Sequence, residues 1–207
     1  KRDLRIYKCD LKWFIVFTII DATFFQLFLT YGISETGAGL GSVLIDSQPL
    51  IVALLARAIF GNLINPIGWL GLLFGLGGII FLGFPQEFLE KWWLMSDKNL
   101  GDITFNFGEA WMLAAALSMA LGTILIRLTC TKSDPVSVTG WHMVFGSLPL
   151  ILKYFLDTNF QSFPNWTFTD WGLMSFASVF GSAIAYGLFF YFANNKEITG
   201  FSTLAFL

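Results

Sequence analysis

Residues 108–130 read GEAWMLAAALSMALGTILIRLTC, a long apolar stretch with one charged residue near each end. A helix needs about 20 mostly apolar residues to cross a bilayer, and this stretch is long enough. Five further stretches pass the same test, at residues 13–33, 38–60, 66–84, 136–156 and 171–193, and a seventh begins near Ile198. The sequence therefore predicts an all-α integral membrane protein, a polytopic helical bundle whose main partner is the lipid bilayer.

The composition agrees with lipid surroundings. Of 207 residues, 56% are hydrophobic and only 13% are charged, whereas soluble domains carry about 25% charged residues. The net charge of -2 gives no argument for a nucleic-acid partner. The two cysteines, Cys9 and Cys130, and the single histidine, His142, form no zinc or disulfide pattern. We therefore expect no metal site and no cofactor.

The basic residues orient the spans. When the spans alternate and the first residue lies inside, nine of the twelve Lys and Arg residues fall on the inner side and three on the outer side. The inner excess is typical of a cytoplasmic face, so we place Lys1 in the cytoplasm or its equivalent. The abundance of Phe, Ile and Asn favours a bacterial plasma membrane, with the plastid envelope as the alternative.

An internal repeat emerges when the chain is shifted by 160 residues. The shift superimposes Tyr31 on Tyr191, Ser42 on Ser202 and Leu44 on Leu204. Five spans separate the equivalent elements, and an odd number of spans inverts the topology. Inverted repeats are a signature of secondary transporters, whose binding site lies between the halves near the midplane.

The richest polar stretch within a span is residues 42–49, SVLIDSQP. It offers Ser42, Asp46 and Gln48 as candidate substrate or ion contacts. Pro49 cannot donate a hydrogen bond to the carbonyl of Ile45, so we predict a helix kink there. The alternative interpretation is a kink whose polar groups simply bond to a neighbouring helix.

Asp21 lies in the middle of the first span. An ionisable residue at that depth costs about 2.5–3.5 kcal/mol on insertion scales and normally faces a cavity or a partner. A proton or cation relay and a structural hydrogen bond to Thr18 or another helix are both open interpretations. Gln26, five residues further along, is a weaker candidate of the same kind.

Three other side chains complete the set of candidates. His142 lies early in its span and could gate a proton, although a lone buried histidine is more often structural. Tyr186 and Tyr191 could bind a polar ligand or serve as interfacial anchors. Glu109 lies in the first turn of its helix, where the helix dipole stabilises a carboxylate, and we favour that structural role for it.

Several segments together resemble a known family. Residues 39–49 (GLGSVLIDSQP), followed by the Gly-rich span 68–83, resemble the end of an EamA-type repeat, and residues 109–122 (EAWMLAAALSMALG) resemble the start of the second one. Residues 134–143 (DPVSVTGWHM) and 181–191 (GSAIAYGLFFY) are similar to the WAT1-related branch of cyanobacteria and plant plastids. The chain thus resembles an EamA-type transporter of the drug/metabolite transporter superfamily.

The resemblance implies ten helices in two inverted repeats of five, with both termini inside. On that frame residues 1–84 are the end of the first repeat (helices three to five), 85–107 an interfacial loop on the outer side, and 108–207 the first part of the second repeat (helices six to eight and the start of nine). The chain would then be a fragment that lacks the first two helices and most of the last two. The implied cavity would draw on the spans holding Asp21, Gln48 and Tyr186. Members often carry Gly-Glu after the Pro-containing helix, whereas this chain has Gly61-Asn62, so no role of that Glu is carried over.

The favoured function is a secondary transporter that exports or exchanges a small metabolite by alternating access. A proton coupled through Asp21 or Asp46 is the candidate driving ion, and a homodimer is compatible with this interpretation. A membrane scaffold or receptor is the alternative, but it would leave the buried polar residues without a role. An integral-membrane enzyme is disfavoured because no cluster of catalytic groups marks one membrane face.

Overall fold

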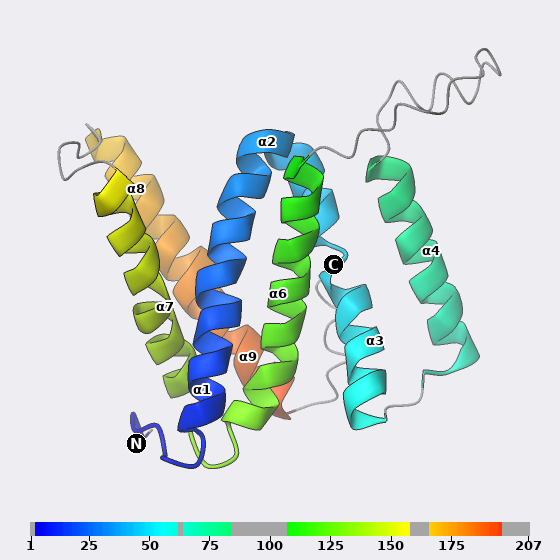
Figure 1. Ribbon diagram of the computed structural model, residues 1–207, viewed down its shortest axis with the longest axis horizontal. Coiled ribbons are helices and arrows are strands. Elements are labelled where there is room, and N and C mark those ends of the chain that lie inside the picture. The colour runs from blue at the N-terminus through cyan, green and yellow to red at the C-terminus, as the bar shows by residue number, and fades with distance from the viewer. Residues whose placement is uncertain (1–2, 62–63, 84–106, 158–165, 196–207) are drawn as a thin grey trace.

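The computed structural model describes residues 3–61, 64–83, 107–157 and 166–195. Within these ranges the regular elements are helices that form an elongated bundle (Figure 1). In chain order they are α1 (Leu11–Phe17), η1 (Thr18–Phe24), α2 (Phe25–Ile45), α3 (Gln48–Phe60), α4 (Pro66–Gly83), α6 (Phe107–Thr129), α7 (Pro135–Asp157), α8 (Phe168–Phe176), η3 (Ala177–Ile184) and α9 (Ala185–Asn195). The expected loop 85–107 lies outside the described residues apart from Phe107, and so does the apolar stretch after Ile198.

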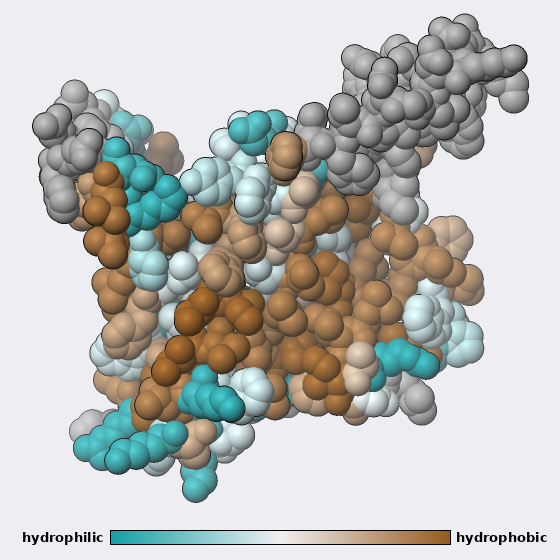
Figure 2. Space-filling model, viewed as in Figure 1, coloured by the Kyte–Doolittle hydropathy of each residue, from teal (hydrophilic) through white to brown (hydrophobic). Residues whose placement is uncertain are grey.

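Four helical stretches are long and apolar enough to cross a membrane, namely Leu11–Ile45, Phe107–Thr129, Pro135–Asp157 and Phe168–Asn194. Gln48–Phe60 and Pro66–Ile79 are shorter apolar helices. A belt of apolar side chains covers the middle of the visible face, and hydrophilic residues gather toward its ends (Figure 2). The prediction of a polytopic helical membrane protein is therefore confirmed.

The first hairpin turns at a single glycine. The predicted loop 34–37 is helical as far as Thr36, and Gly37 then takes φ 76° and ψ 167°. This positive φ is open to glycine because it lacks a Cβ atom. The chain reverses direction there, so α2 arches over one end of the bundle (Figure 1).

The second predicted span, 38–60, is two helices rather than one kinked helix. The α2 helix ends at Ile45, Asp46 and Ser47 form a turn, and α3 starts at Gln48. Pro49 lies in the first turn of α3, where its missing N–H removes no helical hydrogen bond. The break therefore lies just before Pro49, not at a bend around it.

The α6 helix is the central element. It contacts α1, η1, α2, α3 and α9, and small side chains on it let these neighbours approach closely. Ala115, Ala116 and Ala120 are fully buried. By contrast, the described residues of α8 and η3 include no buried side chain, so this arm of the bundle presents its apolar residues outward.

Two π-helical segments, η1 and η3, interrupt otherwise regular helices. The 160-residue shift of the sequence repeat carries Phe25, the first residue of α2, onto Ala185, the first residue of α9. The same shift carries Thr18–Phe24 onto residues 178–184, which lie within η3. The order α1–η1–α2 thus recurs as α8–η3–α9, and the weak sequence repeat has a counterpart in helix geometry.

Candidate functional site

Asp21 lies at the centre of η1 and is only 1% exposed. Ten residues separate it from the start of α1 at Leu11, a rise of about 15 Å at helical spacing. That is roughly half of the ~30 Å hydrocarbon core. The wide turns of a π-helix are frequent at functional sites, and η1 places Asp21 near the middle of the helical stretch that runs from Leu11 to Thr36.

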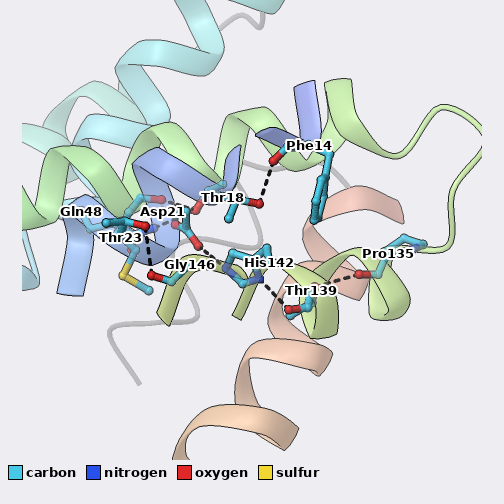
Figure 3. Close-up of polar contacts among 11 residues, drawn as sticks. Phe14, Thr18, Asp21, Thr23, Gln48, Pro135, Thr139, His142 and Gly146 are labelled. Carbon is cyan, nitrogen blue, oxygen red and sulfur yellow. Dashed lines mark hydrogen bonds and ion pairs between the residues drawn. The ribbon is translucent and has the colours of Figure 1, made fainter. Parts of the chain in front are cut away.

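His142 of α7 is the partner of Asp21. Its Nε2 lies 3.0 Å from Oδ2 of Asp21, and its Nδ1 lies 2.6 Å from the carbonyl oxygen of Thr139 (Figure 3). The imidazole is 2% exposed. The structure therefore brings together two residues that lie 121 positions apart in the chain, one in each predicted repeat.

Aromatic rings enclose the pair. Phe17 of α1 stacks on the His142 ring with centroids 4.5 Å apart, and Phe190 of α9 meets the same ring edge-on at 5.8 Å. Phe17 and Phe190 are both fully buried, and Tyr186 packs against Phe190. Apolar walls lower the local dielectric, which strengthens a paired hydrogen bond and penalises an unpaired one.

Two glycines let η1 fit between α6 and α7. A Cβ atom on Gly122 would lie 1.9 Å from Oδ1 of Asp21, and one on Gly146 would lie 2.1 Å from Cβ of Ala22. Thr23 donates a hydrogen bond to the carbonyl of Gly146 at 3.0 Å. Oδ1 of Asp21 is buried against Gly122 and has no hydrogen-bond partner among the described residues.

A second buried polar contact involves the residue that follows Gly122 on α6. Gln48, 4% exposed, donates from Nε2 to Oγ1 of Thr123 at 3.1 Å, and Thr123 follows Gly122 directly. The break between α2 and α3 is thereby fastened to the second predicted repeat. The hydroxyl of Ser47, at that break, is buried and finds no partner among the described residues.

The other predicted candidates lie apart from this pair. Gln26, Ser42, Asp46 and Tyr191 are exposed; the Ser42 hydroxyl donates locally to the carbonyl of Gly39 at 2.8 Å. Tyr186 is half-buried at the aromatic wall. Of the predicted set, the structure therefore unites Asp21, His142 and Tyr186 in one cluster, and Gln48 of α3 bonds to Thr123 of α6 beside it.

Comparison with known proteins identifies the family. The EamA-like transporter family model matches residues 3–84 and 106–207. The chain belongs to the EamA-like transporter family. It is 48% identical over 198 residues to an uncharacterized transporter of Synechocystis sp., covering 94% of this chain and 60% of that relative.

A second relative is a chloroplastic WAT1-related protein of Arabidopsis thaliana. It is 43% identical over 200 residues, which cover 94% of this chain and 46% of the relative. A third, an uncharacterized transporter of Bacillus subtilis, is 26% identical over 200 residues. This EamA-like chain thus spans between about half and two thirds of the length of these relatives. No solved structure matches it.

The hydrogen-bond geometry restricts the protonation of the pair in this EamA-like chain. A carbonyl oxygen can only accept, so Nδ1 of His142 must carry a hydrogen to bond to Thr139. Nε2 then bonds to Asp21 in one of two ways: a protonated carboxyl donates to a neutral imidazole, or an imidazolium donates to a carboxylate. Both states have the same net charge of zero and share one proton.

A second polar cluster, which the sequence analysis did not predict, lies at the end of the bundle where α1 begins. Asp10 is 1% exposed and accepts hydrogen bonds from the Thr131 hydroxyl, from the backbone N–H of Lys132 at 3.0 Å, and from the N–H and hydroxyl of Ser133 at 2.9 and 2.7 Å. We call this cluster, Asp10 with residues 131–133, the Asp10 latch. It ties the start of α1 to the α6–α7 connection.

The Asp10 latch holds a charged carboxylate. Burial alone raises the pKa of Asp10, but the hydrogen bonds from residues 131–133 outweigh burial and lower the pKa from 3.8 to about 2. Hydrogen bonds to the charged form favour it. Asp10 therefore stays ionised throughout the neutral range.

Proposed function

We propose that this chain forms part of a secondary transporter that exports or exchanges a small metabolite by alternating access, driven by protons carried on Asp21 and His142. The observation that supports the proposal best is the buried pair itself, which joins η1 to α7 across the two predicted repeats at mid-depth. In inverted-repeat transporters the repeats rock against each other around a site at this depth. A proton that controls the contact between them is in position to control that motion.

Asp21 is a better candidate for the coupling residue than Asp46. The sequence left both open. Asp21 is buried and bonded to the other predicted repeat, whereas Asp46 is exposed at the turn between α2 and α3. A group whose protonation alters a contact between repeats can couple to their movement, which favours Asp21 over the exposed Asp46.

The surroundings of the pair favour a small substrate with apolar and neutral polar parts. The described side chains next to it are aromatic rings, threonine hydroxyls and the amide of Gln48. The described Lys and Arg side chains lie toward the ends of the helices, as Arg57 and Arg127 do in the last turns of α3 and α6. This arrangement offers little to a phosphorylated substrate, which needs cationic partners.

The proposal extends to the organisation of the whole protein. Residues 1–84 and 108–207 belong to successive repeats on this view, with 85–107 as the connection on the outer side. The membrane is a bacterial plasma membrane or a plastid envelope, since relatives come from a cyanobacterium and a chloroplast. The chain carries no assigned catalytic group under this proposal.

Transport by the whole protein in proteoliposomes tests the proposal. Pools of labelled amino acids and organic acids are offered with and without an imposed pH gradient. We expect uptake from one pool that collapses when the gradient is dissipated. If no labelled compound is taken up by vesicles that hold folded protein, the result favours a scaffold or receptor. Such a protein can also bury polar pairs, but it transports no substrate.

A further inference from the structure

We infer that a single proton, shared between Oδ2 of Asp21 and Nε2 of His142, is required for the contact between η1 and α7, and that its release separates them. The inference concerns the ionic partner of the pair and rests on the proposed function only for its link to transport. It predicts one proton per chain and no metal cation at this site.

The hydrogen bond at Nδ1 determines the tautomer of His142. The Thr139 carbonyl oxygen, 2.6 Å from Nδ1 of His142, has no hydrogen to give. Nδ1 is therefore the protonated nitrogen in every state that keeps this bond. At metal and catalytic sites, too, the hydrogen bond made by one ring nitrogen of a histidine determines the state of the other nitrogen.

The other ring nitrogen, Nε2, faces Asp21. With Nδ1 protonated, a neutral His142 presents a lone pair at Nε2, and an ionised Asp21 presents lone pairs at Oδ2. These atoms lie 3.0 Å apart in a buried site, so without a proton between them two acceptors would face each other. A buried acceptor left unmatched costs about 1–3 kcal/mol, and more when it is charged. Loss of the proton therefore favours separation of η1 from α7.

Neighbouring groups offer no substitute for that proton. The helices packed around the pair contribute Phe17 from α1, Gly122 from α6, Gly146 from α7 and Phe190 from α9. The one titratable side chain among the described neighbours is Tyr186, which carries no charge in its usual form. Within the described ranges, Asp21 and His142 bond to each other and to no other charged side chain.

A metal cation does not fit the same place. Hard cations take six or more oxygen ligands, and the described residues contain no group of three or more His, Cys, Asp or Glu side chains that could hold a metal. The free oxygen of Asp21 faces Gly122 so closely that even a methyl group would overlap it. A proton is the cation that this packing admits.

Nitrogen-15 NMR of histidine in the whole protein reads the tautomer directly. His142 signals are those absent from a His142→Gln sample. We expect Nδ1 to stay protonated while Nε2 either accepts a strong hydrogen bond or carries the shared proton. A neutral His142 with a hydrogen on Nε2 and a bare Nδ1 would overturn the inference.

Proton counting in unbuffered detergent solution tests the stoichiometry. A rise in pH through the titration should release one more proton per chain from the wild type than from Asp21→Asn, whose amide N–H can donate permanently to Nε2. Gln26→Ala, an exposed change two residues beyond the end of η1, should release as many protons as the wild type. Equal release from Asp21→Asn and the wild type would contradict the inference. If NMR shows the predicted tautomer and one proton is released, but uptake does not respond to pH, then the proposed function is wrong and the inference of a shared proton is still supported.

Discussion

Gly122 is the residue that gives Asp21 room to reach His142. A Cβ atom at this position would lie 1.9 Å from Oδ1 of Asp21, and the α6 backbone cannot withdraw without disturbing its other neighbours. Overpacking of this kind costs about 1–3 kcal/mol. Gly122→Ala should therefore lower the unfolding temperature in detergent and remove the pH dependence of transport.

Gly140→Ala is the matched control for this change. Gly140 is also helical, in α7, and a Cβ atom there would meet nothing within 4 Å. We expect wild-type unfolding and transport from it, or a slight gain in stability. A Gly122→Ala protein that unfolds and responds to pH like the wild type would show that Asp21 does not depend on this packing.

Gln48 provides a second test at the residue scale. Its hydrogen bond to Thr123 holds the α2–α3 break against α6, and a typical hydrogen bond contributes about 0.5–1.5 kcal/mol. Gln48→Ala should slow transport by a few-fold to about tenfold without loss of membrane insertion, measured as initial uptake per inserted protein. Gln26→Ala, which changes an exposed amide, should have no such effect, and equal rates in the two variants would remove Gln48 from the site.

The sequence indicated both members of the central pair but not their contact. Asp21 lies in the middle of one apolar span and His142 early in another, and an ionisable residue inside a span needs a partner. A lone histidine is usually structural, and no pattern joins positions 121 residues apart in different repeats. Pairing the two isolated ionisable groups across the inferred repeats would have found the contact, whereas the tautomer depends on a backbone carbonyl that only the fold places.

At the scale of elements, the Asp10 latch joins α1 to the α6–α7 connection. Asp10→Ala leaves the N–H groups of Lys132 and Ser133 without their acceptor, and each buried unmatched group costs about 1–3 kcal/mol. We expect a lower unfolding temperature and faster maleimide labelling of Cys130, which is partly buried next to the latch. In Asp3→Asn, an exposed change in the segment before α1, Cys130 should be labelled as slowly as in the wild type. Equal labelling rates in all three proteins would show that Asp10 does not hold this connection in place.

The stabilisation that Asp10 contributes to the latch depends on pH. The folded pKa of Asp10 is about 2, below its ordinary value of 3.8, so its stabilising effect is complete above about pH 4 and is lost as the pH falls toward 2. Unfolding temperatures of the wild type and Asp10→Ala should therefore differ by a constant amount between pH 5 and 8, taken as roughly the neutral range, and converge in acid. A difference that changed across that range would mean that Asp10 titrates there.

Six spans were predicted, whereas four described helical stretches are long and apolar enough to cross a membrane and two further apolar helices are shorter. Hydropathy reports how much apolar length is present. It does not reveal a π-helical turn, because the turn changes the backbone geometry and not the residues. The break before Gln48 left a signal in Pro49, which was interpreted as a kink because proline is tolerated both at a bend and in a first turn. Asp10 gave no signal, since a polar residue before a span is unremarkable.

At the scale of the whole molecule, the positive-inside rule predicts the side on which each end of the bundle lies. Cys9 is exposed and precedes α1 on the side rich in Lys and Arg. A membrane-impermeant maleimide should therefore label it in inside-out vesicles and not in intact cells or right-side-out vesicles. Glu35→Cys in a Cys9→Ser background lies next to the reversal at Gly37, at the opposite end of the bundle, and should show the reverse. Identical sidedness for the two would overturn the orientation.

Composition and apolar length were sufficient to predict the class of fold, and the family was recognisable from short blocks of sequence. The site required the fold, because its parts come from helices far apart in the chain. The most direct measurement loads proteoliposomes of the whole protein with a pH indicator and adds the substrate found in the uptake screen. We predict that substrate moves protons across the membrane with the wild type, and that Asp21→Asn, folded and inserted, moves none. Substrate-driven proton movement that is undiminished in Asp21→Asn would show that the Asp21–His142 pair does not carry the coupling proton.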